Sequence, residues 1–149
     1  MARVTVRFGA KEWQLWNVHN YELSNADRSR VGVALREAVR RGVEEPFGFL
    51  ALVMGDYNFL EAGETPHHAA GEVAALREGD PAGTAFWRQI LGELCELRQP
   101  SLTHFWKRSM TLSRLDRCYA TMPLHVMRSM RVEAATICDP ELMHATQTV

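Results

Sequence analysis

Two small polar residues, Asp56 and Asn58, follow directly after an apolar run, and their side chains carry the oxygen and nitrogen atoms that phosphate or metal chemistry uses. The run Phe49–Met54 has the length and apolarity of a buried strand, and Gly55 follows it. Because side chains alternate along an extended chain, Asp56 and Asn58 should point to the same side. This pattern indicates a phosphate or metal site at a strand end. It is also typical of a plain strand followed by an Asx-type turn.

Polar residues recur at two other predicted strands. The segment Trp13–His19 carries apolar residues on both faces, and His19-Asn20-Tyr21 closes it with a second change from apolar to polar. In the segment 111–119, Arg114 and Asp116 share one face of a predicted strand, which is unusual for a plain core. Either a satisfied internal ion pair or a catalytic role accounts for this pair.

The elements that must position these residues follow from periodicity. Alternation predicts a hairpin of strands 4–8 and 13–19, with the second strand central in its sheet. Helical spacing predicts a covering helix that begins after N-cap residues in the stretch Ser24-Asn25-Ala26-Asp27 and ends at Gly42. We expect residues 60–83 to form a long surface insertion with a short helix near 71–76. The later elements are a helix with Phe86, Ile90, Leu94 and Leu97 on its apolar face, then strands at 102–106, 111–119 and 126–138, with a turn at Asp139-Pro140.

The bulk composition sets limits. The chain has 149 residues, enough for one domain with a real core, and its hydrophobic fraction of 46% is that of a folded protein. A net charge of −1 gives no general attraction to nucleic acid or to a membrane surface. The three cysteines form no Cys-x-x-Cys pair, which favours reduced, structural thiols. With no apolar signal segment either, we expect an intracellular protein without a membrane partner.

Three spaced motifs carry a family resemblance. They are Asn17-Val18-His19-Asn20, Gly55-Asp56-Tyr57-Asn58 and Ser113-Arg114-Leu115-Asp116-Arg117, the last preceded by the threonine-aromatic stretch 100–105. In this order they resemble the endonuclease/exonuclease/phosphatase superfamily of deoxyribonuclease I, and most closely its endonuclease domains beside reverse transcriptases. The resemblance implies an α/β (α+β) fold, namely part of a four-layer α/β sandwich with mostly antiparallel and mixed strands and covering helices. Residues 1–149 would be a single, incomplete domain.

The resemblance also implies a role for each matching residue. Asp56 would orient or deprotonate a water molecule and contribute to binding Mg²⁺ or Mn²⁺, and Asn58 would donate to a phosphoryl oxygen. His19 would contact phosphate or protonate the leaving oxygen, and Asp116 would orient a catalytic histidine. The substrate would be DNA or RNA, with further contacts from three residues: Asn20, His104 and Arg114.

The chain departs from the family pattern at two places. The family domain opens with strands that carry an Asn and a Glu, the main metal ligand, and it closes with Ser-Asp-His; neither motif occurs here. His144 is either the remnant of that histidine or part of the approach to it, and we favour an approach to a motif that the chain lacks.

These departures change what we expect of the chain. We expect weak metal binding and little or no activity alone, because residues of one catalytic unit are strongly non-additive. We also expect an unpaired sheet edge that a partner could complete, and a fusion to a reverse transcriptase in a longer frame. The alternatives are a non-catalytic nucleic-acid-binding or interaction module, and a phosphatase for lipid or small phosphate esters.

Overall fold

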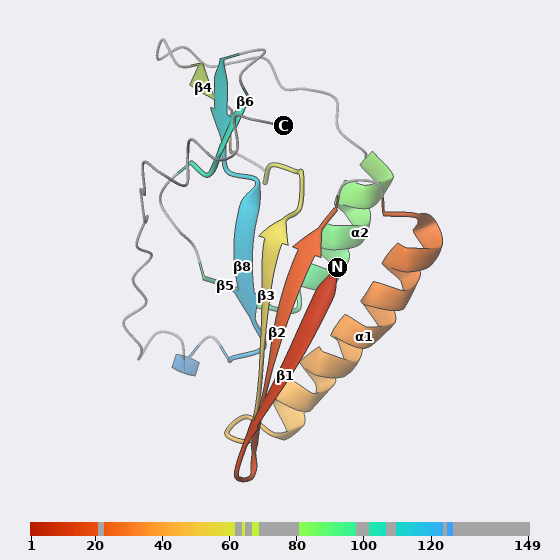
Figure 1. Ribbon diagram of the computed structural model, residues 1–149, viewed down its shortest axis with the longest axis vertical. Helices are drawn as coiled ribbons and strands as arrows, with labels where there is room; N and C mark the ends of the chain where they lie inside the picture. The colour runs from red at the N-terminus through yellow and green to blue at the C-terminus, as the bar shows by residue number, and fades with distance from the viewer. Residues whose placement is uncertain are drawn as a thin grey trace.

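The computed structural model describes residues 1–20, 23–61, 64, 67–68, 81–97, 102–106, 110–123 and 125–126, with backbone only at 67–68 and 104–106. These residues form a mixed α+β fold (Figure 1). A five-stranded sheet has the order β1 (Ala2–Phe8), β2 (Lys11–His19), β3 (Phe49–Asp56), β8 (Asp116–Ala120) and β5 (Cys95–Glu96). A smaller sheet has the order β4 (His67–His68), β7 (Thr111–Ser113) and β6 (His104–Trp106). The helices are α1 (Asn25–Glu44) and α2 (Pro81–Leu91).

The first half of the chain follows the predicted pattern closely. Strands β1 and β2 form the expected antiparallel hairpin, and β2 lies inside the sheet between β1 and β3, as its two apolar faces predicted. Helix α1 connects β2 to β3, which run parallel. Strand β8 then adds antiparallel to the other side of β3. The sheet is therefore mixed, and β3 stands at its centre.

Helix α1 begins where predicted and ends later than predicted. Ser24 is its N-cap, and the Ser24 hydroxyl accepts a hydrogen bond from the backbone N–H of Asp27 at 3.1 Å. The prediction that Gly42 stops the helix is wrong, because the helix continues to Glu44. Gly42 is buried, and a Cβ there would lie 2.6 Å from the Cβ of Thr121. The glycine thus serves close packing against the end of β8.

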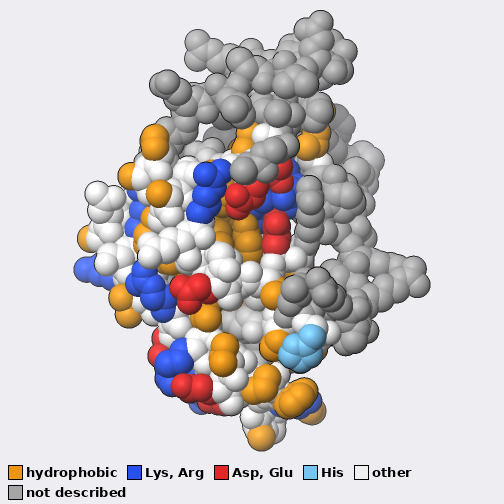
Figure 2. All heavy atoms as spheres, turned by 180° about the vertical axis from the view of Figure 1, so that it is seen from behind, with side chains coloured by type: hydrophobic (Ala, Val, Ile, Leu, Met, Phe, Trp, Pro, Cys, Tyr) orange, Lys and Arg blue, Asp and Glu red, His pale blue; other side chains and the backbone are white. Residues whose placement is uncertain are grey.

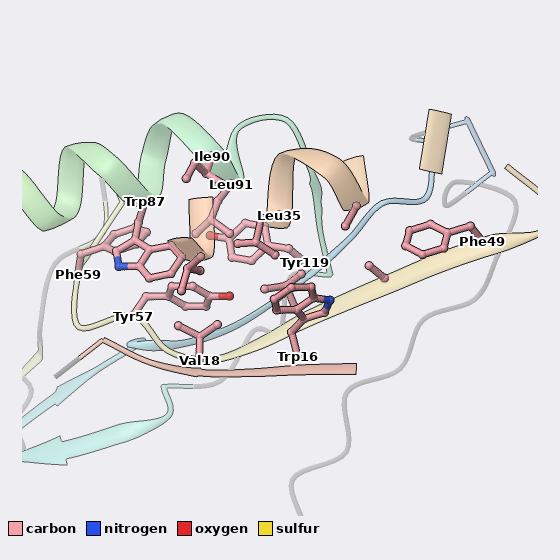
Figure 3. Close-up of a cluster of buried hydrophobic side chains, with 14 residues drawn as sticks. Trp16, Val18, Leu35, Phe49, Tyr57, Phe59, Trp87, Ile90, Leu91 and Tyr119 are labelled. Atoms are coloured by element: carbon pink, nitrogen blue, oxygen red, sulfur yellow. The ribbon is translucent and has the colours of Figure 1, made fainter. Parts of the chain in front are cut away.

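The hydrophobic core lies between the helices and one face of the large sheet (Figure 3). Strand β2 contributes Trp16 and Val18, and the helices contribute residues such as Leu35 and Trp87. Figure 3 shows both helices on the same side of these strands. Among the described residues, the buried core cluster consists of Trp16, Val18, Val31, Leu35, Ala38, Phe49, Ala51, Val53, Tyr57, Phe59, Trp87, Ile90, Leu91 and Tyr119.

The opposite face of the large sheet has a different character. Because side chains alternate, the residues that follow or precede the core positions point to this second face. We call this second face of the sheet the open face. Large apolar side chains in its central rows are exposed to solvent, namely Val4, Val6, Trp13, Leu15 and Met54.

Two later elements differ from prediction. Helix α2 ends at Leu91, so the expected continuation through Leu94 and Leu97 is wrong. Gly92 follows the helix directly, in a turn where its N–H donates to the carbonyl of Arg88 at 3.0 Å. The chain then extends and pairs β5 with β8, so tertiary pairing overrides the helical spacing of these leucines.

The predicted single strand 111–119 is also wrong, because it divides into β7 and β8, which belong to different sheets. The break falls at Arg114 and Leu115. At this break the carbonyl of Leu115 accepts from the N–H of Tyr57 at 3.1 Å, while Ser113 accepts from Thr103 at 2.9 Å. The two halves therefore satisfy their backbone groups with different neighbours.

Several expectations fall outside the described residues. They are the short helix at 71–76, all but the first residue of the strand at 126–138, the turn at Asp139-Pro140, and His144. Within the described part of the chain, neither helix combines the length and apolarity needed to cross a membrane.

Candidate functional site

Three of the predicted catalytic residues lie side by side at the end of the large sheet. His19 is paired with Asp56 in the parallel ladder of β2 and β3. Asp56 is in turn paired with Asp116 in the antiparallel ladder of β3 and β8. Side chains at paired positions project from the same face, and here that is the open face. We call these three residues the strand-end row. Positions far apart in sequence therefore form one line of titratable groups.

The geometry around Gly55 fixes the centre of this row. Gly55 has φ +147°, and a Cβ at this position would overlap the carbonyl oxygen of Val18 on the adjacent strand. The close approach of β3 to β2 thus requires glycine, and it sets the register that pairs His19 with Asp56. Just beyond, Tyr57 is fully buried, with its ring edge-on to Trp87 at a centroid distance of 5.2 Å. Residue 56 is therefore held between two immobilised neighbours.

Asn58 completes the strand end through an Asx-type turn. Its φ is +54°, a left-handed conformation that asparagine tolerates better than most residues. Its backbone N–H donates to a carboxylate oxygen of Asp56 at 2.8 Å. The Asn58 side chain is exposed beside the row. The Asx-type turn predicted from the motif is confirmed, and it places the Asp56 carboxylate and the Asn58 amide together at the strand end. The phosphate or metal site stays a prediction.

Asn20 is buried and links neighbouring elements through hydrogen bonds. It is 7% exposed, its side-chain amide donates to the carbonyl of Tyr57 at 2.9 Å, and its side-chain oxygen accepts from the Trp87 indole at 2.7 Å. Its backbone N–H donates to the carbonyl of Asp56 at 2.9 Å. Asn20 therefore joins the ends of β2, β3 and α2. With both ends of its amide used internally, it supports the row from below.

Arg114 belongs to a buried ion-pair network of Glu64, Glu96, Arg114 and Arg117. Glu96 accepts from Arg114 at 2.6 Å and from Arg117 at 3.0 Å, and Glu64 accepts from both arginines. The two arginines are 6% and 2% exposed. Of the two readings of Arg114, the internal ion pair accounts for its position, with glutamates as its partners.

The ion-pair network is also a feature that sequence reasoning missed. Glu64 lies in the stretch interpreted as a surface insertion, and Glu96 lies in the segment interpreted as helix. Burial raises the pKa of the Glu64 carboxyl, but hydrogen bonds from Arg114, from the Glu61 backbone and from Arg117 outweigh that effect and hold the pKa at about 2. An Arg-x-x-Arg spacing around a strand start was the available signal, and its carboxylate partners lie too far away in sequence to be assigned.

The last predicted substrate contact, His104, is described by its backbone alone. The backbone of His104 lies in β6, paired with Ser113, and its side chain is outside the described atoms. Next to it, the Thr103 hydroxyl accepts from the backbone N–H of Asp116 at 3.0 Å. The threonine-aromatic stretch therefore helps to fix the start of β8.

The charged residues of α1 are mostly neutralised by neighbours. Arg40 pairs with Glu37 and Glu44, and Arg41 pairs with Glu12 at 2.7 Å. Figure 2 shows basic and acidic side chains interspersed on the side seen from behind, with neither sign dominating. The helix therefore presents a solvated, salt-bridged surface.

The expected metal site finds limited support in the side chains themselves. Among the residues that the structure describes, no group of three or more His, Cys, Asp and Glu side chains is arranged to hold a metal ion. The strand-end row is a line across three strands and does not form such a group. It offers two carboxylates, Asp56 and Asp116, on neighbouring strands.

A scan against protein-family models, a search of curated proteins and a search of solved structures each found no match for this chain.

Proposed function

We propose that this chain is an endonuclease-like phosphodiesterase domain that acts on nucleic acid, with the strand-end row as its chemical centre. The observation that carries the proposal is the register that aligns His19, Asp56 and Asp116. These residues were selected from three separate motifs, and a plain scaffold gives no reason for them to meet. A row of one imidazole and two carboxylates on a solvent-facing sheet end suits acid–base chemistry on a phosphate ester.

The residues take the following roles in hydrolysis. Asp56 accepts a proton from the attacking water as the water oxygen forms its bond to phosphorus. His19 gives a proton to the leaving oxygen as the phosphorus–oxygen bond breaks, so that one water is consumed for each diester cleaved. The exposed amide of Asn58 donates a hydrogen bond to a phosphoryl oxygen and stabilises the charge that develops there.

A divalent ion would fit the row only weakly. Mg²⁺ in phosphoryl-transfer sites is bound by one or two carboxylates, with waters and substrate phosphates completing its shell. Asp56 and Asp116 would hold Mg²⁺ or Mn²⁺ in this way. A bound ion would supply charge neutralisation at the phosphate. Because two carboxylates retain the ion poorly without substrate, we propose weak metal affinity and slow turnover.

The finer fold assignment belongs to the same proposal. A mixed sheet with two helices on one face and an apolar surface on the other is compatible with part of a four-layer α/β sandwich. The association with a reverse transcriptase rests on the motif resemblance.

A plasmid-nicking assay with Mg²⁺ or Mn²⁺ tests the function. We expect slow conversion of supercoiled to open-circular DNA, and a loss of at least about a hundredfold in His19→Gln, since acid–base groups contribute that much or more. His125→Gln is the matched control, because His125 is an exposed histidine in a different part of the fold. Equal nicking by both histidine variants would show that the strand-end row does not catalyse the cleavage.

The alternative is a non-catalytic nucleic-acid-binding module. The observation that favours it is the small donor set at the row. Filter binding at two salt concentrations separates the two functions, because phosphate contacts weaken steeply as salt rises. Salt-dependent binding with no nicking by the wild-type chain would establish the binding module in place of the enzyme.

A further inference from the structure

The apolar residues of the open face have no role in the proposed function. Val4 is 57% exposed, Val6 46% and Trp13 52%, and Leu15 and Met54 lie beside them. The ladder register makes these side chains contiguous. Val4 is paired with Leu15 and Val6 with Trp13, and Met54 is paired with Asn17, the next residue after Leu15 on the same face of β2. Both described helices pack on the opposite side of the sheet. Single exposed apolar residues are ordinary, but a continuous patch marks an interaction surface.

We propose that the open face is a dimer interface, at which two copies of this chain pack their sheets face to face with antiparallel strand directions. Three observations assign a second copy as the partner. They are the area of the surface, its polar rim and the complementary placement of its charges.

The area agrees with what a dimer needs. Phe8 extends the patch at the end of β1, where it is 84% exposed and alternates onto the same face as Val4 and Val6. Scaling the exposed fractions by residue size gives roughly 600 Å² for these six residues, and the polar residues around them bring the surface toward the ~800 Å² per partner of a standard interface. Two sheets packed face to face lie about 10 Å apart, which suits interdigitating valine, leucine and methionine side chains.

The rim of the patch is polar, as it is in protein interfaces generally. Along β2 the apolar rows end at Asn17 and His19 on one side and at Lys11 on the other, and all three are exposed. The hollow that Lys11 lines, of about 190 Å³, is otherwise mainly apolar and includes Trp13, Phe47 and Leu50. The surface is thus concave and apolar at one end and polar at its borders.

The charges fix the relative orientation of the copies. Lys11 lies at the start of β2, while Asp56 and Asp116 lie at the opposite end of the same face. Lys11 has no ion pair with any residue in the described part of the chain. An antiparallel arrangement directs each Lys11 toward the two carboxylates of the other copy and covers the strand-end row, so the row is open to a phosphate ester only in the separated chain. A parallel arrangement would set like charges together. The overall charge of −1 per chain opposes this association only slightly.

Light scattering coupled to size exclusion tests the proposal with three variants of the full chain. The wild type should have twice the 16.9 kDa chain mass at micromolar concentration. Val6→Lys should raise the dimer dissociation constant at least tenfold, and so should Lys11→Glu. Val33→Lys is the matched control, because Val33 is 65% exposed on α1, away from the open face. This control should stay dimeric.

Three results would overturn the proposal. They are a wild-type monomer up to ~100 μM, where even weak specific dimers populate, a dimer equally strong in Val6→Lys and Val33→Lys, and assemblies larger than dimers. An unchanged dimer in Lys11→Glu would overturn the orientation. Acrylamide quenching of tryptophan fluorescence covers the case that Val6→Lys does not fold. Dilution of the wild type should increase quenching, and Trp13→Phe should abolish that change; an effect of dilution that persists in Trp13→Phe contradicts the interface.

Discussion

His19 and Asp56 occupy the last paired position of the parallel strands β2 and β3, so an imidazole and a carboxylate project side by side from the end of the sheet. Asp116 extends this line on the next strand. Two carboxylates that face each other across a ladder repel, and a fold selected for stability alone would avoid them. The arrangement therefore predicts that the row can be altered at little cost to folding and at large cost to function.

The first prediction separates these two costs. Asp56→Asn removes a charge but keeps an oxygen that can accept the hydrogen bond from the Asn58 backbone. We expect the free energy of unfolding to stay constant or rise by up to about 1 kcal/mol, because repulsion with Asp116 disappears. Plasmid nicking should fall at least about a hundredfold. Urea denaturation and the nicking assay measure the two effects. A destabilised Asp56→Asn with normal nicking would contradict the proposed role.

The second prediction concerns the close approach of β2 and β3. Gly55→Ala would drive a methyl group into the carbonyl of Val18, at a φ that alanine rarely adopts. We expect a loss of about 4 kcal/mol or failure to fold, an exceptional value for one substitution. Gly9→Ala is the control, since Gly9 has φ +59° but no atom near its virtual Cβ. Its cost should be about 1–2 kcal/mol, from the backbone conformation alone. Equal losses in chemical denaturation would show that packing at Gly55 is irrelevant.

The third prediction tests Asn20 as a structural tie. Asn20→Ala leaves the Trp87 indole N–H and the Tyr57 carbonyl without their buried partner. Each unsatisfied group costs about 1–3 kcal/mol, so the loss of two partners should lower the free energy of unfolding by about 2–6 kcal/mol. Asn17→Ala, at an exposed position on the same strand, should change it by less than about 0.5 kcal/mol. If nucleic-acid affinity fell in Asn20→Ala while stability held, Asn20 would instead be a substrate contact.

The fourth prediction is a pH dependence of stability from Glu64. Its carboxyl pKa is lowered from 4.5 to about 2 in the folded chain, so folding favours the ionised form. The contribution is complete above pH 4.5 and is lost as the pH falls toward 2. Glu64→Gln should remove this acid-sensitive part of the unfolding curve. At neutral pH it should cost about 3 kcal/mol, because the buried Arg117 loses a partner.

Glu37→Gln is the control for the pH experiment. Glu37 pairs with Arg40 on the surface of α1, where both side chains are more than half exposed. Exposed ion pairs contribute little to stability, so this variant should unfold nearly as the wild type does over the whole pH range. The same acid sensitivity in wild type and Glu64→Gln would show that the ion-pair network does not control acid unfolding.

Local patterns in the sequence were sufficient to predict an element where the interactions that determine it are short in range. Alternation along Val4–Phe8 and Trp13–His19 predicts the hairpin, and Ser24 predicts the start of α1, because each depends on residues a few positions apart. Gly55-Asp56-Tyr57-Asn58 predicts both the end of β3 and its turn. In the C-terminal half, helical spacing of Leu94 and Leu97 gave the wrong element, because pairing with β8 outweighs weak local preference.

Only the tertiary structure decided which polar residues face one another. The sequence placed His19 and Asp56 at strand ends but placed Asp116 inside a strand 111–119. The structure starts β8 at Asp116, and the order β2–β3–β8 with its register places the three residues in one row. The sequence left Arg114 open between an ion pair and catalysis, and Glu64 and Glu96 decide for the ion pair. The physical reason is common to both cases. Long-range partners are selected by the packing of whole strands and by the need to neutralise buried charge, and no local pattern carries that information.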